Sequence, residues 1–424
     1  MCLLQNIEVK FIETMDMITF FLEIAVMLSV ALLCGQLMSK LRLPAVFGEL
    51  FGGIILGPTV WGWLSPGTYH WLFPTSGAIF QGRDALIQIC VLFFLFAAGL
   101  EMNLNLAKKR VTNIVSASLM GIVVPFVLGF GMVFLFPDLW KGHFHVGTLL
   151  FAMFIGTALS ISALPVIVRI LMDLDLMNTD MGMIITGAAT IDDLIGWSLF
   201  AFILSNLAPD SIINIPPYMT FLLVLLLFAF MLTIGRVIAQ EALKWLKSYM
   251  PWPGSFLGIT AVLLLITAAC AEAIGIHAVF GAFLVGLAFS QNLEKRDNAH
   301  EMVYQFVMYF FAPLYFVSVG LRANFVASFD LVLVLAVLSI ACIGKILGVT
   351  LGLRASKMPW KQSAAVGFAL NARGAMEMIL ATVAKDAGLI DDHLFVALII
   401  MALVTSVLSG PIMSRLNGSH VAVG

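Results

Sequence analysis

Two adjacent carboxylates, Asp192 and Asp193, lie near the middle of an apolar segment, residues 181–205, that is long enough to cross a bilayer. A charge at the centre of a membrane costs roughly 2.5–3.5 kcal/mol on insertion scales, so an acid at that depth indicates a function. Two neighbouring carboxylates repel each other, which favours the binding of a proton or a cation to at least one of them. A membrane-embedded group that accepts either is what ion exchange requires.

Three further ionisable residues, Lys345, Arg373 and Glu377, are predicted to lie deep in apolar segments. Five unpaired charges would cost about 15 kcal/mol, which is comparable with the net stability of a fold, so these groups must pair. Arg373 and Glu377 are four residues apart and can neutralise each other on one helix face. Lys345 and Asp192 are predicted at similar depths, within reach of a lysine side chain. Three acids and two bases leave one carboxylate that is stable only with a proton or a cation, which is the minimal mechanism of cation/proton antiport.

The composition indicates an all-α polytopic membrane protein. The chain of 424 residues is 61% hydrophobic and 11% charged, and its mean hydropathy is +1.06. The net charge of −2 gives no indication of a nucleic-acid partner. The five cysteines show no metal-binding or disulfide spacing, and we expect no cofactor.

Apolar runs divided by polar, proline or glycine residues predict about thirteen transmembrane helices. The predicted ranges are 16–38, 44–63, 84–103, 112–136, 146–172, 180–207, 216–236, 254–273, 275–291, 301–321, 329–353, 360–388 and 391–415. We therefore expect an N-terminal tail at 1–15, a transmembrane domain at 16–415 and a C-terminal tail at 416–424.

Basic residues predict the orientation, because cytoplasmic loops carry an excess of lysine and arginine. If thirteen helices alternate, fifteen basic residues fall on one side and five on the other. The fifteen are Lys40, Arg42, Lys108, Lys109, Arg110, Arg169, Arg236, Lys244, Lys247, Lys295, Arg296, Arg354, Lys357, Lys361 and Arg415. We expect a multi-pass protein of the cell (inner) membrane, with its N-terminus outside and its C-terminus in the cytoplasm.

Two short sequences recur along the chain. Residues 45–48 and 278–281 both read Ala-Val-Phe-Gly, at the start of the second and ninth predicted helices. Residues 99–103 read Gly-Leu-Glu-Met-Asn and residues 320–324 read Gly-Leu-Arg-Ala-Asn, at the ends of the third and tenth. Both matches imply a shift of seven helices. An odd shift reverses the direction through the membrane, so we predict inverted-topology repeats, as in many transporters.

Under the same shift the fifth predicted helix matches the twelfth, and both are interrupted. Residues 156–165 read Gly-Thr-Ala-Leu-Ser-Ile-Ser-Ala-Leu-Pro, and residues 367–374 read Gly-Phe-Ala-Leu-Asn-Ala-Arg-Gly. Ordinary kinks are the alternative, but broken helices at matching positions favour a substrate site. The hydroxyls of Thr157, Ser160 and Ser162 are candidate ion ligands there, with hydrogen bonds inside their own helix as the alternative.

These motifs together resemble the membrane domain of the monovalent cation:proton antiporter family, in the branch that contains NapA-type sodium exchangers, KefC-type potassium exchangers and plant exchangers. The segments that carry the resemblance are 157–166, 188–197, 311–321, 344–348 and 371–378, and the similarity covers nearly the whole chain. It implies a homodimer with a dimerisation domain and a six-helix core domain, at about 112–207 and 329–415. In that core the two discontinuous helices would cross.

The resemblance also implies roles for single residues. Asp193, the second acid of the pair, would bind the transported metal cation or the proton. Asp192 would pair with Lys345, and Ser162 would help to bind the ion. The pair Asp-Asp with a lysine is typical of sodium exchangers, whereas KefC-like members carry Gln-Asp and plant-like members Asn-Asp. We therefore expect electrogenic exchange of Na⁺ or Li⁺ for protons across the lipid bilayer.

Arg373 matches an arginine of the family, but the common Arg-Gly-Glu is Arg-Gly-Ala-Met-Glu here. That spacing resembles the plant-type exchangers and leaves the role of Glu377 open.

Three alternatives remain. K⁺/H⁺ exchange belongs to the same class, although no Gly-x-Gly-x-x-Gly segment of a nucleotide-gated potassium system follows the last predicted helix. A Na⁺-coupled solute symporter would need a larger substrate cavity. An intramembrane aspartyl protease would carry its two acids on separate helices, in Tyr-Asp and Gly-x-Gly-Asp contexts, and neither context occurs here.

Overall fold

The fold was analysed in a computed structural model whose backbone is described for residues 2–41, 43–101, 110–144, 146–174, 176–177, 179–206, 217–273, 278–290 and 298–417. The described backbone is helical apart from turns, short connections and one isolated β-bridge between Phe144 and Ile390. Several residues used in the sequence predictions lie outside the described backbone: Arg42, Met102, Asn103, Lys108, Lys109, Lys295, Arg296 and the tail 418–424. For residues 1–15 and for Arg169, the side chains also lie outside the part of the chain that the structure describes.

The chain forms two compact units, which are described separately. Unit 1 is Met1–Phe94 with Glu301–Ser328. It contains α1 (Cys2–Lys40), α2 (Ala45–Leu56), α3 (Trp61–Leu64), α4 (Pro66–Leu72), the first part of α5 (Ala78–Glu101), most of α15 (Asn298–Phe306), the π-helical turn η3 (Val307–Phe311) and α16 (Ala312–Leu321). The predicted tail at 1–15 is therefore largely a continuation of α1.

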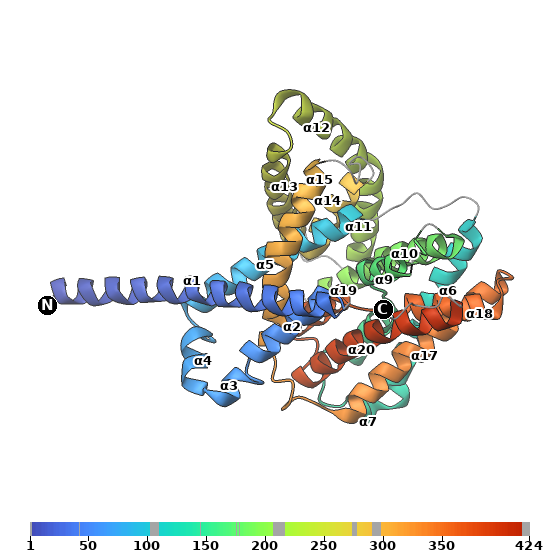
Figure 1. Cartoon of the computed structure of the whole chain (residues 1–424), viewed down its shortest axis with the longest axis horizontal. Helices are drawn as coiled ribbons and strands as arrows, with labels where there is room; N and C mark the ends of the chain where they lie inside the picture. The colour runs from blue at the N-terminus through green and yellow to red at the C-terminus, as the bar shows by residue number, and fades with distance from the viewer. Residues whose placement is uncertain are drawn as a thin grey trace. The chain divides into compact units, whose positions relative to one another are not determined.

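Unit 2 is Leu95–His300 with Phe329–Gly424. Its first helices are α6 (Val111–Leu135), α7 (Pro137–Trp140), α8 (Thr148–Ser160), α9 (Leu164–Asp173), α10 (Asp180–Ser205), α11 (Pro217–Phe230), η2 (Met231–Gly235), α12 (Arg236–Tyr249), α13 (Gly254–Ala273) and α14 (Ala278–Ser290). The last are α17 (Leu331–Ala355), α18 (Trp360–Leu370), α19 (Ala375–Asp386) and α20 (Asp392–Asn417). Both ranges predicted for the core domain fall in this unit, which also holds α11–α14. In Figure 1, α17 packs beside α6, α18 and α20.

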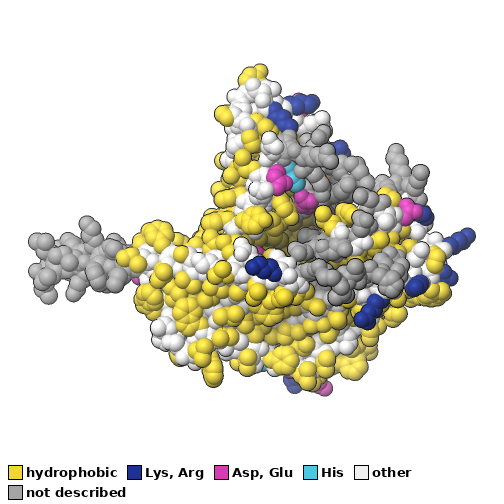
Figure 2. All heavy atoms as spheres, viewed as in Figure 1, with side chains coloured by type: hydrophobic (Ala, Val, Ile, Leu, Met, Phe, Trp, Pro, Cys, Tyr) yellow, Lys and Arg dark blue, Asp and Glu magenta, His cyan; other side chains and the backbone are white. Residues whose placement is uncertain are grey.

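The described helices confirm a multi-pass membrane protein. Ten of them are long and apolar enough to cross a bilayer, and α8 and α14 are shorter apolar helices. Every predicted span contains helix, and the number of thirteen crossings stays a prediction. Hydrophobic side chains cover much of the face seen in Figure 2. That surface is expected for helices whose solvent is lipid.

The helix that contains the seventh predicted span, 216–236, extends beyond the predicted end. One helix continues through α11, η2 and α12 as far as Tyr249, so Lys244 and Lys247 lie on a helix and not in a loop. Residues 236–249 are too polar to count as a span on their own, but they are amphipathic. Ala239, Leu243 and Leu246 repeat at helical spacing and are buried, which extends the helix by packing.

The predicted sequence repeat reappears as a repeated packing contact. In unit 1, a Cβ atom at Gly53 of α2 would lie 2.1 Å from the carbonyl oxygen of Val317, three residues before Gly320. In unit 2, a Cβ atom at Gly286 of α14 would lie 2.1 Å from the carbonyl oxygen of Phe96. Phe96 precedes Gly99 by three residues, and Gly53 and Gly286 each follow their Ala-Val-Phe-Gly motif at the same spacing. Each motif therefore marks a helix that approaches its neighbour closely enough to require glycine.

A second glycine contact positions Lys345. Gly344, Gly348 and Gly352 lie one helical turn apart on α17, and Cβ atoms at Gly348 and Gly352 would each lie 2.4 Å from a carbonyl oxygen of α6. Small residues of this kind let membrane helices approach closely. A Cβ atom at Gly121 of α6 would lie 3.8 Å from the Lys345 amine, so the same contact brings α6 against that side chain.

We predict that Gly286→Ala lowers the thermal unfolding midpoint of the purified protein, because the new methyl group meets backbone that cannot move aside. Overpacking of this kind costs about 1–3 kcal/mol. Gly258→Ala on α13 is the matched control, since its methyl group would meet nothing within 4 Å. Equal midpoints for the two variants in a detergent melt would show that the contact between α5 and α14 is not tight.

Candidate ion-binding site

Two interrupted helices touch where they unwind. The first interruption separates α8 from α9 at residues 161–163, and the second separates α18 from α19 at residues 371–374. The backbone N–H of Ala163 donates to the carbonyl of Ala372 at 3.0 Å, so the two unwound segments are in direct contact. Pro165, near the start of α9, cannot donate a helical hydrogen bond, which favours a break before it. The break leaves helix ends without intrahelical partners inside the membrane domain.

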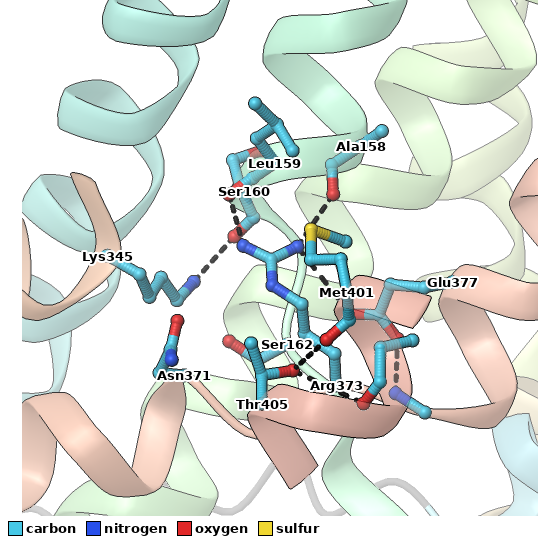
Figure 3. Close-up of polar contacts among 12 residues, drawn as sticks. Ala158, Leu159, Ser160, Ser162, Lys345, Asn371, Arg373, Glu377, Met401 and Thr405 are labelled. Carbon is cyan, nitrogen blue, oxygen red and sulfur yellow. Dashed lines mark hydrogen bonds and ion pairs between the residues drawn. The ribbon is translucent and has the colours of Figure 1, made fainter. Parts of the chain in front are cut away.

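Two basic side chains, those of Arg373 and Lys345, bind the carboxyl-terminal end of α8 (Figure 3). Arg373 donates to the carbonyl oxygens of Ala158, at 2.7 Å, and of Leu159. The Lys345 amine donates to the carbonyl of Ser160 at 2.5 Å. The end of a helix carries a partial negative charge and unsatisfied carbonyls, and these two residues supply both the charge and the donors.

Glu377 caps the other broken helix. Its Oε2 accepts a hydrogen bond from the Gly374 backbone N–H at 2.8 Å, at the amino-terminal end of α19, where the partial charge is positive. Its Oε1 lies 3.9 Å from Arg373 Nη1. The prediction that these two residues neutralise each other assumed a continuous helix. Arg373 instead lies in the unwound segment before α19, and its hydrogen bonds go to α8.

Asp192 is buried, and both of its oxygens accept hydrogen bonds. Its Oδ2 lies 2.6 Å from the Lys345 amine and 3.0 Å from the Ser162 hydroxyl. Its Oδ1 accepts from the Ser118 hydroxyl of α6 at 2.6 Å. All four side chains are at most 1% exposed. The Lys345 amine and two serine hydroxyls therefore provide every hydrogen bond and the opposite charge that an ionised Asp192 carboxylate needs.

Asp193 is equally buried, but neither of its oxygens has a hydrogen-bond partner among the residues that the structure describes. The charged groups acting on it are Glu377, Asp192 and Lys345, so two of the three are acids. A buried carboxylate without a partner is strongly disfavoured as a bare anion. This position is therefore suited to hold either a proton or a cation.

The three candidate hydroxyls differ in their contacts. Ser160 donates to the carbonyl of Thr157 at 2.9 Å, and Thr157 donates to the carbonyl of Met153 at 2.8 Å, so both serve their own helix. Ser162 lies in the unwound segment, between the carbonyl of Leu370 at 2.8 Å and Asp192. A hydroxyl has one proton and can donate to only one of these acceptors at a time.

Sequence reasoning missed Ser118 and the carbonyl groups at the end of α8. Ser118 was recognisable only as a small polar residue in an apolar segment, a signal it shares with many serines that bond to their own helix. Carbonyl groups carry no sequence signal at all. Their role follows from the place where α8 stops.

The comparison with protein families identifies the class. The family described as "Sodium/hydrogen exchanger, transmembrane" matches residues 26–416, so the chain belongs to this family. It is therefore a membrane transporter and not an enzyme, as the sequence predicted.

Curated relatives and a solved structure agree with this family. The chain is 34% identical over 401 residues to cation/H(+) antiporter 17 of Arabidopsis thaliana, covering 92% of this chain and 47% of that protein. It thus spans about half the length of the plant relatives it matches. It is 29% identical to the Na(+)/H(+) antiporter NhaS4 of Synechocystis (95% of this chain, 98% of that one) and 29% identical to the Na(+)/H(+)-K(+) antiporter GerN of Bacillus cereus (94% and 97%). The fold is similar to that of the sodium proton antiporter MjNhaP1 from Methanocaldococcus jannaschii, with a TM-score of 0.66 at 16% identity over 95% of this chain and 99% of that one.

The two neighbouring acids should respond oppositely to neutralisation. We predict that Asp192→Asn destabilises the protein by about 3–5 kcal/mol, because it leaves the buried Lys345 charge without its acid. Asp193→Asn removes an unpaired charge and should leave the thermal unfolding midpoint unchanged or raise it. Melts of both purified variants at neutral pH test this, and a larger loss for Asp193→Asn would contradict the assignment of Asp192 as the paired acid.

Proposed function

We propose that the protein is a secondary antiporter that exchanges a monovalent cation, Na⁺ or Li⁺, for protons, and that Asp193 is the residue that binds both. The single observation that carries this proposal is the contrast between two adjacent acids. Asp192 has a partner for each oxygen, whereas Asp193 is just as buried and has none among the described residues. The names of NhaS4 and GerN support a Na⁺/H⁺ exchanger, and family membership supports the class.

The charge balance explains why the exchange would be obligatory. Lys345 compensates Asp192, and Arg373 lies beside Glu377 while binding the end of α8. One negative charge, at Asp193, then remains. A proton and an alkali cation can each neutralise it, but they compete for the same oxygens. Because the bare carboxylate is costly in the membrane interior, the site would cross the membrane filled with one or the other.

The contacts of Ser162 support a place for it beside the ion. Its hydroxyl lies in the unwound segment and shares its proton between Asp192 and the carbonyl of Leu370. When it donates to one acceptor, its own lone pairs remain free for a cation. Ser160 and Thr157 are further ligand candidates, because their hydroxyls donate within α8 and keep their lone pairs for a cation.

K⁺/H⁺ exchange is the second candidate. The name of GerN, an Na(+)/H(+)-K(+) antiporter, supports K⁺ as a cargo in a relative of matching length. The Arg-Gly-Ala-Met-Glu spacing at residues 373–377 also resembles the plant-type exchangers. The Asp-Asp pair and its lysine favour Na⁺, so the first assignment stays Na⁺ or Li⁺. The names of these relatives give no support to a Na⁺-coupled symporter, and both acids lie on the single helix α10, unlike those of an intramembrane aspartyl protease.

The proposed setting is the cell membrane. The N-terminus would lie outside and the C-terminus in the cytoplasm, as the distribution of basic residues predicts. The protein would act as a homodimer.

Asp193→Asn should abolish exchange while the protein still inserts and folds, because the amide cannot exchange a proton for a cation. The measurement uses proteoliposomes with an acridine-type pH dye and pulses of Na⁺, Li⁺ and K⁺. We expect the wild type to respond to Na⁺ and Li⁺ and the variant to give the signal of empty vesicles. Wild-type exchange by Asp193→Asn would overturn the assignment, and a wild-type response to K⁺ alone would favour the second candidate.

Lys345→Ala should leave exchange that no longer depends on voltage. The electrogenic exchange expected from the resemblance requires a second proton for each cation, which we assign to the Lys345–Asp192 pair, and each net charge moved contributes about 2.3 kcal/mol at 100 mV. Without the amine, one proton would balance one cation. Transport currents on a solid-supported membrane should vanish while dye-detected exchange persists, and currents of wild-type size would reject this role of Lys345.

A further inference from the structure

One buried hydrogen-bond donor, the indole N–H of Trp197, lies four residues after Asp193 on α10. Trp197 lies on α10 and is 2% exposed, and its indole N–H has no hydrogen-bond partner among the residues that the structure describes. A buried donor that is left unsatisfied is costly, and tryptophan side chains usually find a partner for the N–H when they are buried. The nearest lone acceptor along the same helix is Asp193, whose two oxygens are also without partners.

The spacing of Asp193 and Trp197 places the two residues on the same face of α10. Asp193 and Trp197 are four residues apart on the continuous helix α10, and residues with this spacing lie on one face. Helical side chains lean towards the amino terminus, so the side chain of Trp197 is directed towards the turn that carries Asp193.

Aromatic neighbours hold the ring in place. Trp197 stacks on Phe283 of α14, with ring centroids 6.1 Å apart and an angle of 28° between the planes. Phe200 packs edge-on at 6.0 Å. These contacts restrict the indole ring, so the Asp193 side chain is the partner that would move to bring donor and acceptor together.

We propose that Trp197 is a positioning residue whose indole N–H donates a hydrogen bond to the Asp193 carboxylate whenever no cation or proton occupies it. This inference rests on the proposed antiport function, and it adds a step to it. The ionised, empty carboxylate gains a donor, and an arriving cation takes the place of that donor. The N–H then loses that acceptor. Trp197 thus stabilises the empty site between the release of one ion and the binding of the next.

Trp140 provides a matched control. It is also a fully buried tryptophan of unit 2 that packs on a phenylalanine, Phe151. Its N–H already donates to the carbonyl of Met132 at 3.1 Å, so its hydrogen bond belongs to the scaffold. Replacing either residue by phenylalanine removes one indole N–H and a similar volume from the same unit.

The kinetic experiment compares the wild type, Trp197→Phe and Trp140→Phe in proteoliposomes, at one alkaline pH where protons compete weakly, with Na⁺ and K⁺ as probe ions. Loss of the donor destabilises the empty site relative to the cation-bound site. We expect Trp197→Phe to lower the KM for the transported cation about tenfold without raising kcat, since a hydrogen bond to a charged group is among the stronger ones. Trp140→Phe should keep the wild-type KM. A merely structural role of Trp197 would lower kcat or the yield and leave KM unchanged, which would overturn the inference.

A second measurement follows the indole directly. Tryptophan emission shifts when the N–H gains or loses an anionic acceptor, so cation titration should move the emission of Trp197 to shorter wavelength. The signal is the difference between the wild type and Trp197→Phe, and it should be absent in Asp193→Asn. If Trp197→Phe does not accumulate, a protein that retains Trp197 and lacks the other tryptophans gives the same readout. No cation-dependent shift in a protein that transports the cation would overturn the inference.

The two proposals fail in distinguishable ways. A wild-type protein that exchanges no cation for protons refutes the antiport function, and the role of Trp197 with it. A wild-type protein that exchanges normally, together with a Trp197→Phe variant of unchanged KM, refutes the role of Trp197 alone.

Discussion

The structure of the site depends on one constraint, which is that helix ends exposed by unwinding must be satisfied away from water. The last carbonyls of α8 accept hydrogen bonds from Arg373 and Lys345, and the Gly374 N–H at the start of α19 donates to Glu377. The ionised forms of these three residues would be opposite in sign to the partial charges at the helix ends, and many of their partners are backbone groups. Arg373 thereby joins the two broken helices, since it belongs to one and binds the end of the other, and Lys345 of α17 binds the same end.

That arrangement gives two neighbouring acids different roles. Asp192 and Asp193 are consecutive on α10, so their side chains leave the helix about 100° apart. One points to Ser118, Ser162 and Lys345, and the other has no described partner. Asp192 pairs with the buried Lys345 amine, which also binds the end of α8. The ion-exchanging function proposed for Asp193 rests on what the rest of the network leaves unsatisfied.

Close helix packing sets the positions of these groups. The glycines of α17 bring it against α6, which places Lys345 and Ser118 on either side of Asp192. In each unit a glycine contact of the same form joins the two helices that carry the repeated motifs. Without a hydrophobic driving force between helices in lipid, such tight contacts are a main source of specific packing. The close glycine contacts therefore determine where the charged groups of the site lie.

The sequence alone predicted the membrane class, most of the helical segments, the two interruptions and the burial of the two adjacent acids, because hydropathy and the cost of buried charge act locally along the chain. It also indicated the pairing of Asp192 with Lys345, since charges that cannot reach water must find each other. Only the tertiary structure decided that Arg373 binds α8, that Ser118 completes Asp192, and that Ser160 and Thr157 turn inward to their own helix. Those outcomes depend on where helices end and cross. A free backbone carbonyl or an unpaired indole N–H has no sequence pattern that would predict it.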